Sequence, residues 1–137
     1  MHKFQSFVLV AVLSLTAAGL ATASDFDGSS PLICVPTDIM SCHGAADCGR
    51  MTAEEVGIPQ FLHLDFKSGT MSGTLETGEE RKASFKVVSN EDNATILQGA
   101  QGRRAFSILI DHEHGEMSAA IAGDEGGIMI LGACMKR

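Results

Sequence analysis

The chain has 137 residues with a formal net charge of −7, and it contains four Cys but neither Trp nor Tyr. The acidic balance repels phosphate backbones and so disfavours nucleic-acid binding. The lack of Trp and Tyr counts against a carbohydrate site, because these side chains are large amphipathic anchors.

The N-terminus has the pattern of a secretory signal peptide. Lys3 supplies a positive charge, Phe7 to Leu15 are apolar apart from Ser14, and Ala21-Thr22-Ala23 forms a small-x-small cleavage site. The apolar run is short for a membrane span. We therefore interpret residues 1–23 as a signal peptide. We expect a soluble mature chain, periplasmic or secreted, with no stable membrane anchor after cleavage and no nucleic-acid partner.

Four cysteines fall in the mature chain, at Cys34, Cys42, Cys48 and Cys134. In an exported protein an even number indicates disulfides, here with three possible connectivities. Leu32–Val35 is the only strand-like run before Phe61, and pairing it with the last strand would bring Cys34 near Cys134. The sequence thus favours Cys34–Cys134 with Cys42–Cys48.

The remainder of residues 24–60 shows little periodicity. Ser24 to Ser30 read as a mobile leader, Pro36 is expected to stop the first strand, and Thr37 to Arg50 is expected to be a disulfide-tied loop. Thr52 and Glu55 have capping-box spacing and Gly57 can end a turn, so Met51 to Gly57 predicts a short helix.

From Phe61 onward the hydrophobic period is two, which indicates strands. Short breaks favour an antiparallel meander over parallel strands with crossovers. Closure into a small barrel, with Leu32–Val35 completing it, would remove the exposed edges; a two-sheet sandwich is the alternative. We expect residues 61–137 to form one domain with 31–60. The seven predicted strands are Phe61–Phe66, Thr70–Leu75, Lys82–Val88, Ala94–Gln98, Ala105–Ile110, Met117–Ala122 and Ile128–Cys134.

An internal repeat organises this region. Leu64 to Leu75 and Ile110 to Ile121 both fit [Leu/Ile]-Asp-x-x-x-Gly-x-Met-Ser-x-x-[Leu/Ile]. An Asp that opens a turn and a Gly that accepts a positive φ predict two matching β-hairpins. Met71 and Met117 should share the inward face. The last strand is apolar on both sides, and we expect the cysteine-bearing N-terminal segment to cover its outer side.

His112 and His114 are the strongest candidates for metal ligands, because an extended His-x-His places both imidazoles on one side. The first copy of the repeat has Phe66-Lys67-Ser68 at these positions, so the turn does not need ligands, and a solvated turn is the favoured interpretation. Cys42-His43 with Asp47-Cys48 matches no common zinc spacing. No nucleophile signature is present, and the carboxylate pairs fall in predicted turns or on the short helix.

Several short motifs resemble those of a group of uncharacterised small exported β-rich proteins of Gram-negative bacteria. They are the N-terminal cysteine cluster, Pro59-Gln60-Phe61, Ile96-Leu97-Gln98-Gly99, the Asp111 to Gly115 turn and the ending Gly132-Ala133-Cys134. The resemblance implies a periplasmic or secreted location and supplies no activity, ligand or functional residue.

These observations predict an exported, non-enzymatic binding module without a cofactor. It could be a periplasmic inhibitor or an envelope accessory protein that contacts an unknown protein partner. A metal-binding protein that uses His112 and His114 is the second hypothesis, and a small hydrolase ranks last.

Overall fold

A computed structural model describes residues 25–44 and 46–137, so the predicted signal peptide lies outside the described residues. The described chain is all-β, and none of it forms a helix long and apolar enough to cross a membrane. The strands are β1 (Leu32–Cys42), β2 (Cys48–Arg50), β3 (Leu62–Asp65), β4 (Thr70–Thr74), β5 (Glu80–Glu91), β6 (Ala94–Gln101), β7 (Arg104–Asp111), β8 (Glu116–Gly123) and β9 (Gly126–Lys136).

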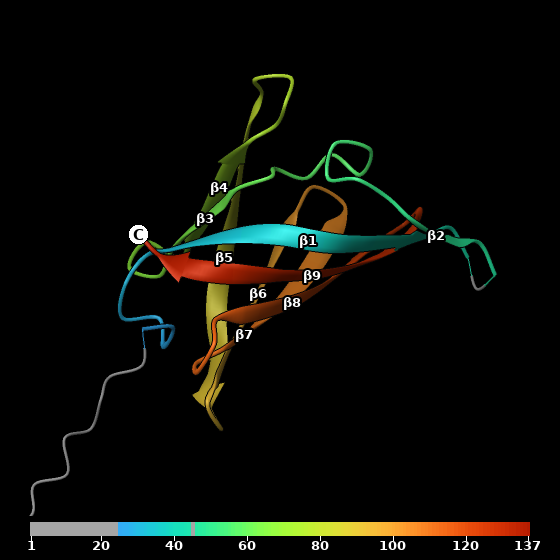
Figure 1. Cartoon of the computed structure of the whole chain (residues 1–137). Helices are drawn as coiled ribbons and strands as arrows, with labels where there is room; N and C mark the ends of the chain where they lie inside the picture. The colour runs from blue at the N-terminus through green and yellow to red at the C-terminus, as the bar shows by residue number, and fades with distance from the viewer. Residues whose placement is uncertain (1–24, 45) are drawn as a thin grey trace, which may run out of the picture.

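The sheet closes into an eight-stranded antiparallel barrel. From β3 to β9 each strand pairs with the next, and β1 lies between β3 and β9, which completes the circle (Figure 1). The ninth strand, β2, pairs only with the end of β1. The predicted meander and small barrel are confirmed, and the sandwich alternative is wrong. Closure leaves no unpaired edge along most of the wall.

The first strand is much longer than predicted, because it continues through Pro36 to Cys42. Its pairing with β9 shifts register between Pro36 and Asp38. On its other side, β3 pairs only as far as Cys34 and β2 pairs only from Met40. Pro36 thus occupies an irregular position with a neighbour on one side, where the missing N–H is tolerated. Most of the predicted loop from Thr37 to Arg50 is therefore a hairpin.

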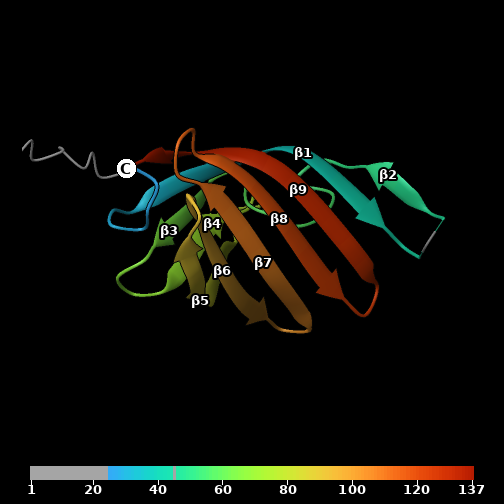
Figure 2. The same ribbon diagram turned by 90° about the horizontal axis from the view of Figure 1, so that it is seen from below.

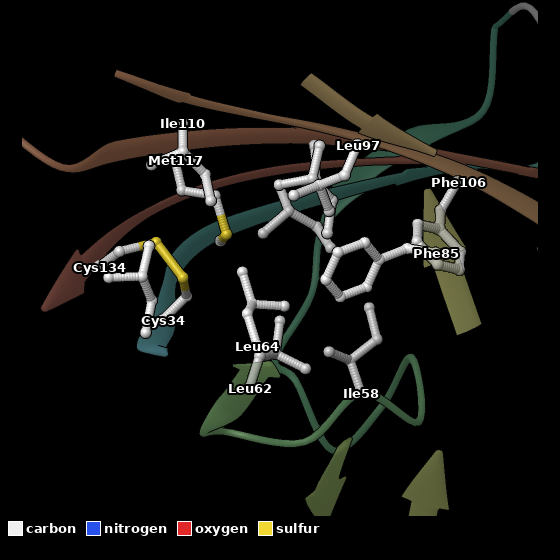
Figure 3. Packing of buried hydrophobic residues seen from close by; sticks show 14 of the residues in the cluster. Cys34, Ile58, Leu62, Leu64, Phe85, Leu97, Phe106, Ile110, Met117 and Cys134 are labelled. Carbon is white, nitrogen blue, oxygen red and sulfur yellow. A yellow bond between two sulfur atoms is a disulfide. The ribbon is translucent and has the colours of Figure 1, made fainter. Parts of the chain in front are cut away.

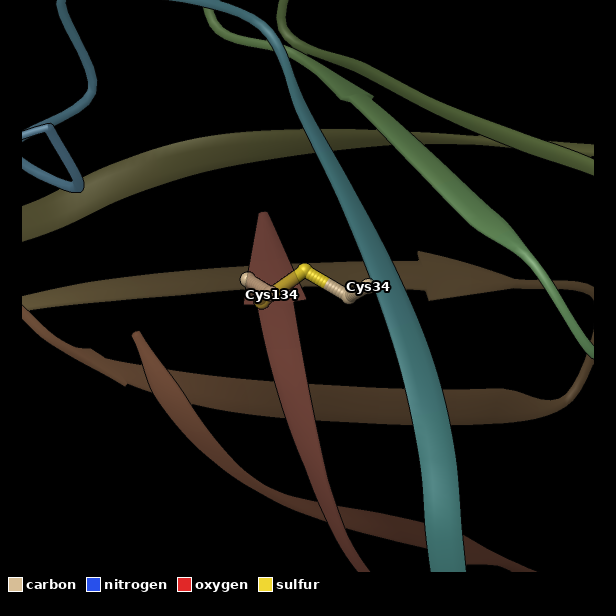
Figure 4. The surroundings of a disulfide bond; sticks show 2 residues. All are labelled: Cys34 and Cys134. Atoms are coloured by element: carbon tan, nitrogen blue, oxygen red, sulfur yellow. A yellow bond between two sulfur atoms is a disulfide. The ribbon is translucent and has the colours of Figure 1, made fainter. Parts of the chain in front are cut away.

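Both disulfides connect directly paired strands. Cys34 is bonded to Cys134 between β1 and β9 (Figure 4), and Cys42 is bonded to Cys48 between β1 and β2. These are the pairs that the strand argument favoured. The first bridge is buried at the point where the barrel closes, whereas Cys48 is exposed in the outer hairpin.

The two copies of the repeat form the β3–β4 and β7–β8 hairpins, as predicted. Asp65 Oδ1 accepts hydrogen bonds from the backbone N–H groups of Lys67 and Ser68 at 3.0 and 3.2 Å. Asp111 Oδ1 accepts the corresponding bonds from Glu113 and His114 at 3.0 and 2.7 Å.

The residues that follow these turns also correspond. Gly69 and Gly115 both adopt positive φ, at 63° and 70°. Met71 packs against the buried core, and Met117 is part of it. The two methionines therefore share the inward face, as the repeat predicted.

The predicted leader and the segment that follows β2 pack against the two ends of the barrel. Phe26 packs against the core, and Asn90 donates a hydrogen bond to the carbonyl of Asp27 at 3.0 Å. The prediction of a mobile leader is therefore wrong for residues 25–30. The opposite end is covered by the segment from Met51 to Phe61, whose Val56 and Ile58 are buried.

The predicted helix in that covering segment is also wrong, although its capping box forms. Thr52 N–H donates to Glu55 at 2.7 Å, and Glu55 N–H donates to Thr52 Oγ1 at 3.3 Å. Gly57 then turns the chain at φ 66°. The segment therefore makes consecutive turns, because Gly57 and Pro59 follow before a helix can propagate.

The barrel interior is a single apolar core (Figure 3). It includes the Cys34–Cys134 bridge between β1 and β9 together with inward side chains of the other barrel strands. Large side chains such as Leu64, Leu97 and Ile110 are almost fully buried. Small inward residues make room for the chain that covers the end: a Cβ on Gly73 would lie 2.5 Å from Pro59 Cβ and from the Phe61 carbonyl oxygen. This confirms that Gly73 occupies a tight inward position.

Candidate protein-contact face

The two histidines proposed as metal ligands have different partners. His112 Nε2 lies 2.8 Å from Thr95 Oγ1, and the His112 backbone N–H donates to Asn93 at 2.9 Å. His114 Nδ1 instead lies 3.5 Å from Asp111 Oδ1, on an exposed side chain. Within residues 25–44 and 46–137, no three His, Cys, Asp or Glu side chains come together in a metal-binding group.

The hydrogen bonds of its own turn account for the perturbed carboxyl of Asp111. The backbone N–H of His114, followed by that of Glu113, lowers the pKa of this carboxyl below its ordinary value. In the first copy the N–H of Ser68 lowers the pKa of Asp65 in the same way. Both carboxylates therefore have a structural role, because their hydrogen bonds order the two hairpin turns.

The remaining candidates are dispersed over the surface. Cys42 and Cys48 are bonded to each other, so their thiolates are not available to a metal. His43 is exposed beside this bridge, and its N–H donates to the Asp47 carbonyl at 2.9 Å. His63 lies on the outer side of β3, in a polar groove of about 530 Å³, and not inside the barrel.

A different feature stands out, an exposed apolar area on the outer wall around β9. We call it the apolar face. Met129, Leu131 and Met135 of β9 are 61%, 50% and 59% exposed. The expectation that the N-terminal segment covers this side is wrong, because β1 lies beside β9 in the wall and not over it. The face consists of Met40 of β1, Leu109 of β7, Ser118 and Ala120 of β8, and Met129, Leu131 and Met135 of β9.

Strand register makes the apolar face continuous. Met129 pairs with Met40 on one side and with Ala120 on the other. Leu131 pairs with Asp38 on one side and with Ser118 on the other, and Ser118 in turn pairs with Leu109. Directly opposed residues have Cβ atoms about 4.5–5.5 Å apart, so these positions are neighbours across four adjacent strands. Figure 2 shows these strands as one curved wall.

The part of the apolar face on β8 and β9 is uncharged, and the residues around it, which include Asp38 opposite Leu131, are mostly acidic. The outward residues of β9 from Met129 to Met135 are uncharged, and Ser118 and Ala120 lie beside them. Glu116 pairs with Ala133, between Leu131 and Met135, and Glu113 precedes it in the β7–β8 turn, whereas Asp124 and Glu125 lie in the turn at the other end. The nearby basic side chains are paired with acids: Arg50 with Asp38 at 3.0 Å, Arg103 with Asp124 at 2.9 Å and Lys136 with Asp25 at 3.1 Å.

The opposite wall of the barrel has a different surface. On β5 the outward residues Lys82, Ser84 and Lys86 are polar and exposed. Single exposed apolar side chains are ordinary on protein surfaces, but a contiguous group with a polar rim is typical of a contact site. Methionine side chains suit such a site because they are flexible and polarisable.

The sequence contained part of the signal for this face. Ile128 to Leu131 are apolar on both sides of the strand, which shows that the outer side carries Met129 and Leu131. Met40 was missed because its segment was assigned to a loop. Comparisons with known protein families, with curated proteins and with solved structures found no match for this chain.

Proposed function

We propose that the mature protein is an exported, non-enzymatic binding module that contacts a protein partner through the apolar face. The observation that carries the proposal is the continuous group of Met40, Leu109, Met129 and Leu131, which is larger than the other exposed apolar positions of the described chain, Phe61 and the pair Val87 and Val88. Burying such a surface is favourable at about 25 cal/mol per Å² of apolar area. The closed, disulfide-bonded barrel is a rigid support for it.

The proposed location is the periplasm or the extracellular medium. Disulfides persist in these oxidising compartments, and both bridges of this chain connect paired strands. The signal-peptide pattern of residues 1–23 and the resemblance to small exported proteins support the same location.

Charge favours a different protein over a second copy as the partner. Mature chains beginning at Ser24 carry nine Lys and Arg against seventeen Asp and Glu, so two copies repel each other. The acidic rim at Glu113, Glu116 and Glu125 complements a partner whose apolar patch is flanked by basic residues.

The test is a capture experiment with matched variants. The mature protein is immobilised and exposed to a native envelope extract, in parallel with the double variant Met129→Gln/Leu131→Gln and with the control Ser84→Gln on the polar wall. We expect one protein captured at near 1:1 stoichiometry by the parent and the control, and at least tenfold less by the double variant. Equal capture by the double variant would refute the apolar face as the contact.

Two measurements on the same preparation address the other hypotheses. Near-stoichiometric zinc or copper that disappears in His112→Ala/His114→Ala would favour a metal-binding protein. Hydrolase turnover that persists through repurification would favour an enzyme.

A further inference from the structure

The barrel contains an apolar cavity of about 80 Å³. Its deep part is lined by the inward side chains of Met71, Ile108, Met117 and Ile130. Eight-stranded barrels have an interior that is either filled by side chains or holds one small ligand. This volume is about half of the ~150 Å³ that accommodates benzene in an apolar protein cavity. It therefore has room for an aliphatic group of about three or four carbons.

The mouth of the cavity is cationic, although the protein as a whole is acidic. Arg81 at the start of β5, Gln101 at the end of β6 and Arg104 at the start of β7 line it. Arg104 Nη1 donates to the Val56 carbonyl at 3.4 Å, which holds the covering segment beside the opening. Among the described residues, no carboxylate lines this cavity.

Arg81 is available to an incoming anion. Its inward direction follows from the alternation of β5, in which Ala83 and Phe85 face the core. Its Nε lies 3.3 Å from Glu79 Oε1, and both side chains are about half exposed. An exposed ion pair of this kind contributes little stability, so a ligand carboxylate can replace Glu79 at small cost. The guanidinium fork matches a carboxylate in a bidentate arrangement.

We propose that this cavity binds a short-chain aliphatic carboxylate. The tail lies between Met71 and Met117, and the carboxylate is held by Arg81 with Arg104 at the mouth. An apolar pocket with a few converging polar groups is the usual form of a small-molecule site. The proposal is independent of the protein contact, because the cavity is inside the barrel and the apolar face is on its outer wall.

The test is a titration of the mature protein with pentanoate, followed through the ε-methyl NMR signals of its methionines. We expect saturable shifts of Met71 and Met117, with Met129 unchanged and a Kd on the order of 1 mM or tighter, a range open to a ligand of this size. Pentan-1-ol lacks the charge and acetate lacks the tail, so both should bind at least tenfold more weakly.

Two variants in the cavity and one control outside it assign the site. Arg81→Gln should weaken pentanoate at least fivefold and leave pentan-1-ol unchanged, whereas Arg103→Gln, an exposed arginine outside the cavity, should change neither. Ala119→Leu adds volume to the cavity wall and should abolish binding of both. Unshifted Met71 and Met117 signals at 50 mM pentanoate in the folded parent would overturn the proposal. Equal affinities for pentanoate and pentan-1-ol would overturn the role of the carboxylate.

Discussion

The two disulfides should contribute unequally to stability, because they close loops of very different length in the unfolded chain. The Cys34–Cys134 bridge spans a sequence separation of 100, whereas Cys42–Cys48 spans 6. Loop-closure entropy then gives about 4.7 kcal/mol for the long bridge and about 2.2 kcal/mol for the short one. Cys34 and Cys134 are also buried beside the core, so replacing them loses packing as well.

The measurement compares two double variants, Cys34→Ala/Cys134→Ala and Cys42→Ala/Cys48→Ala, by urea unfolding at 25 °C. Alanine avoids placing an unpaired hydroxyl in the core. We expect the long-range variant to lose at least about 2.5 kcal/mol more free energy of unfolding than the short-range variant, since the loop-closure difference is increased by the lost packing. Equal losses, or a larger loss in the Cys42/Cys48 variant, would refute the argument from loop length and burial.

Three further predictions concern the repeat and the core. In urea unfolding, Gly115→Ala should lower the free energy of unfolding by more than about 2 kcal/mol, and Gly78→Ala by about 1 kcal/mol. Both glycines have positive φ, but only a Cβ on Gly115 would meet Phe26, at 2.5 Å. Asp65 and Asp111 have lowered pKa values in the fold, so the free energy of unfolding should fall as pH drops below about 3.8 and through the folded-state values. Asp65→Asn/Asp111→Asn should flatten this fall in a pH series of urea midpoints, and an unchanged slope would contradict the turn assignment. Ile110→Ala should cost about 2–5 kcal/mol and Ile110→Val about 1 kcal/mol by the same assay; near-zero losses would place Ile110 outside the core.

The barrel wall was predictable because its signals are local. Period-two alternation and turn residues located β3 to β9 within a few residues, and the repeated Asp and Gly fixed the two hairpin turns. Propagation of β1 past Pro36 was not predictable in this way. It depends on the partner strand β9 and on an irregular register that no local pattern encodes.

The candidate sites show the same difference between local features, which the sequence predicts, and features that depend on distant strands. A histidine pair is conspicuous in sequence, yet His112 is hydrogen-bonded to Thr95, which lies seventeen residues earlier on another strand, and His114 is not. The apolar face is built from β1, β7, β8 and β9, and it becomes visible only when strand register places Met40 beside Met129. The internal cavity depends on how Gly57, Ile58 and Pro59 cover one end of the barrel. Short-range patterns carry no information about such placements.

Site-specific photo-crosslinking tests the proposed contact most directly. A photoreactive residue at Ala120, at the centre of the apolar face, is compared with one at Ser84 on the polar wall, with both proteins exported in living cells. We predict one discrete adduct from the Ala120 position, absent from the Ser84 position and lost when Met129→Gln/Leu131→Gln is added. Adducts of equal yield from both positions, or none from Ala120, would contradict a protein contact through this face.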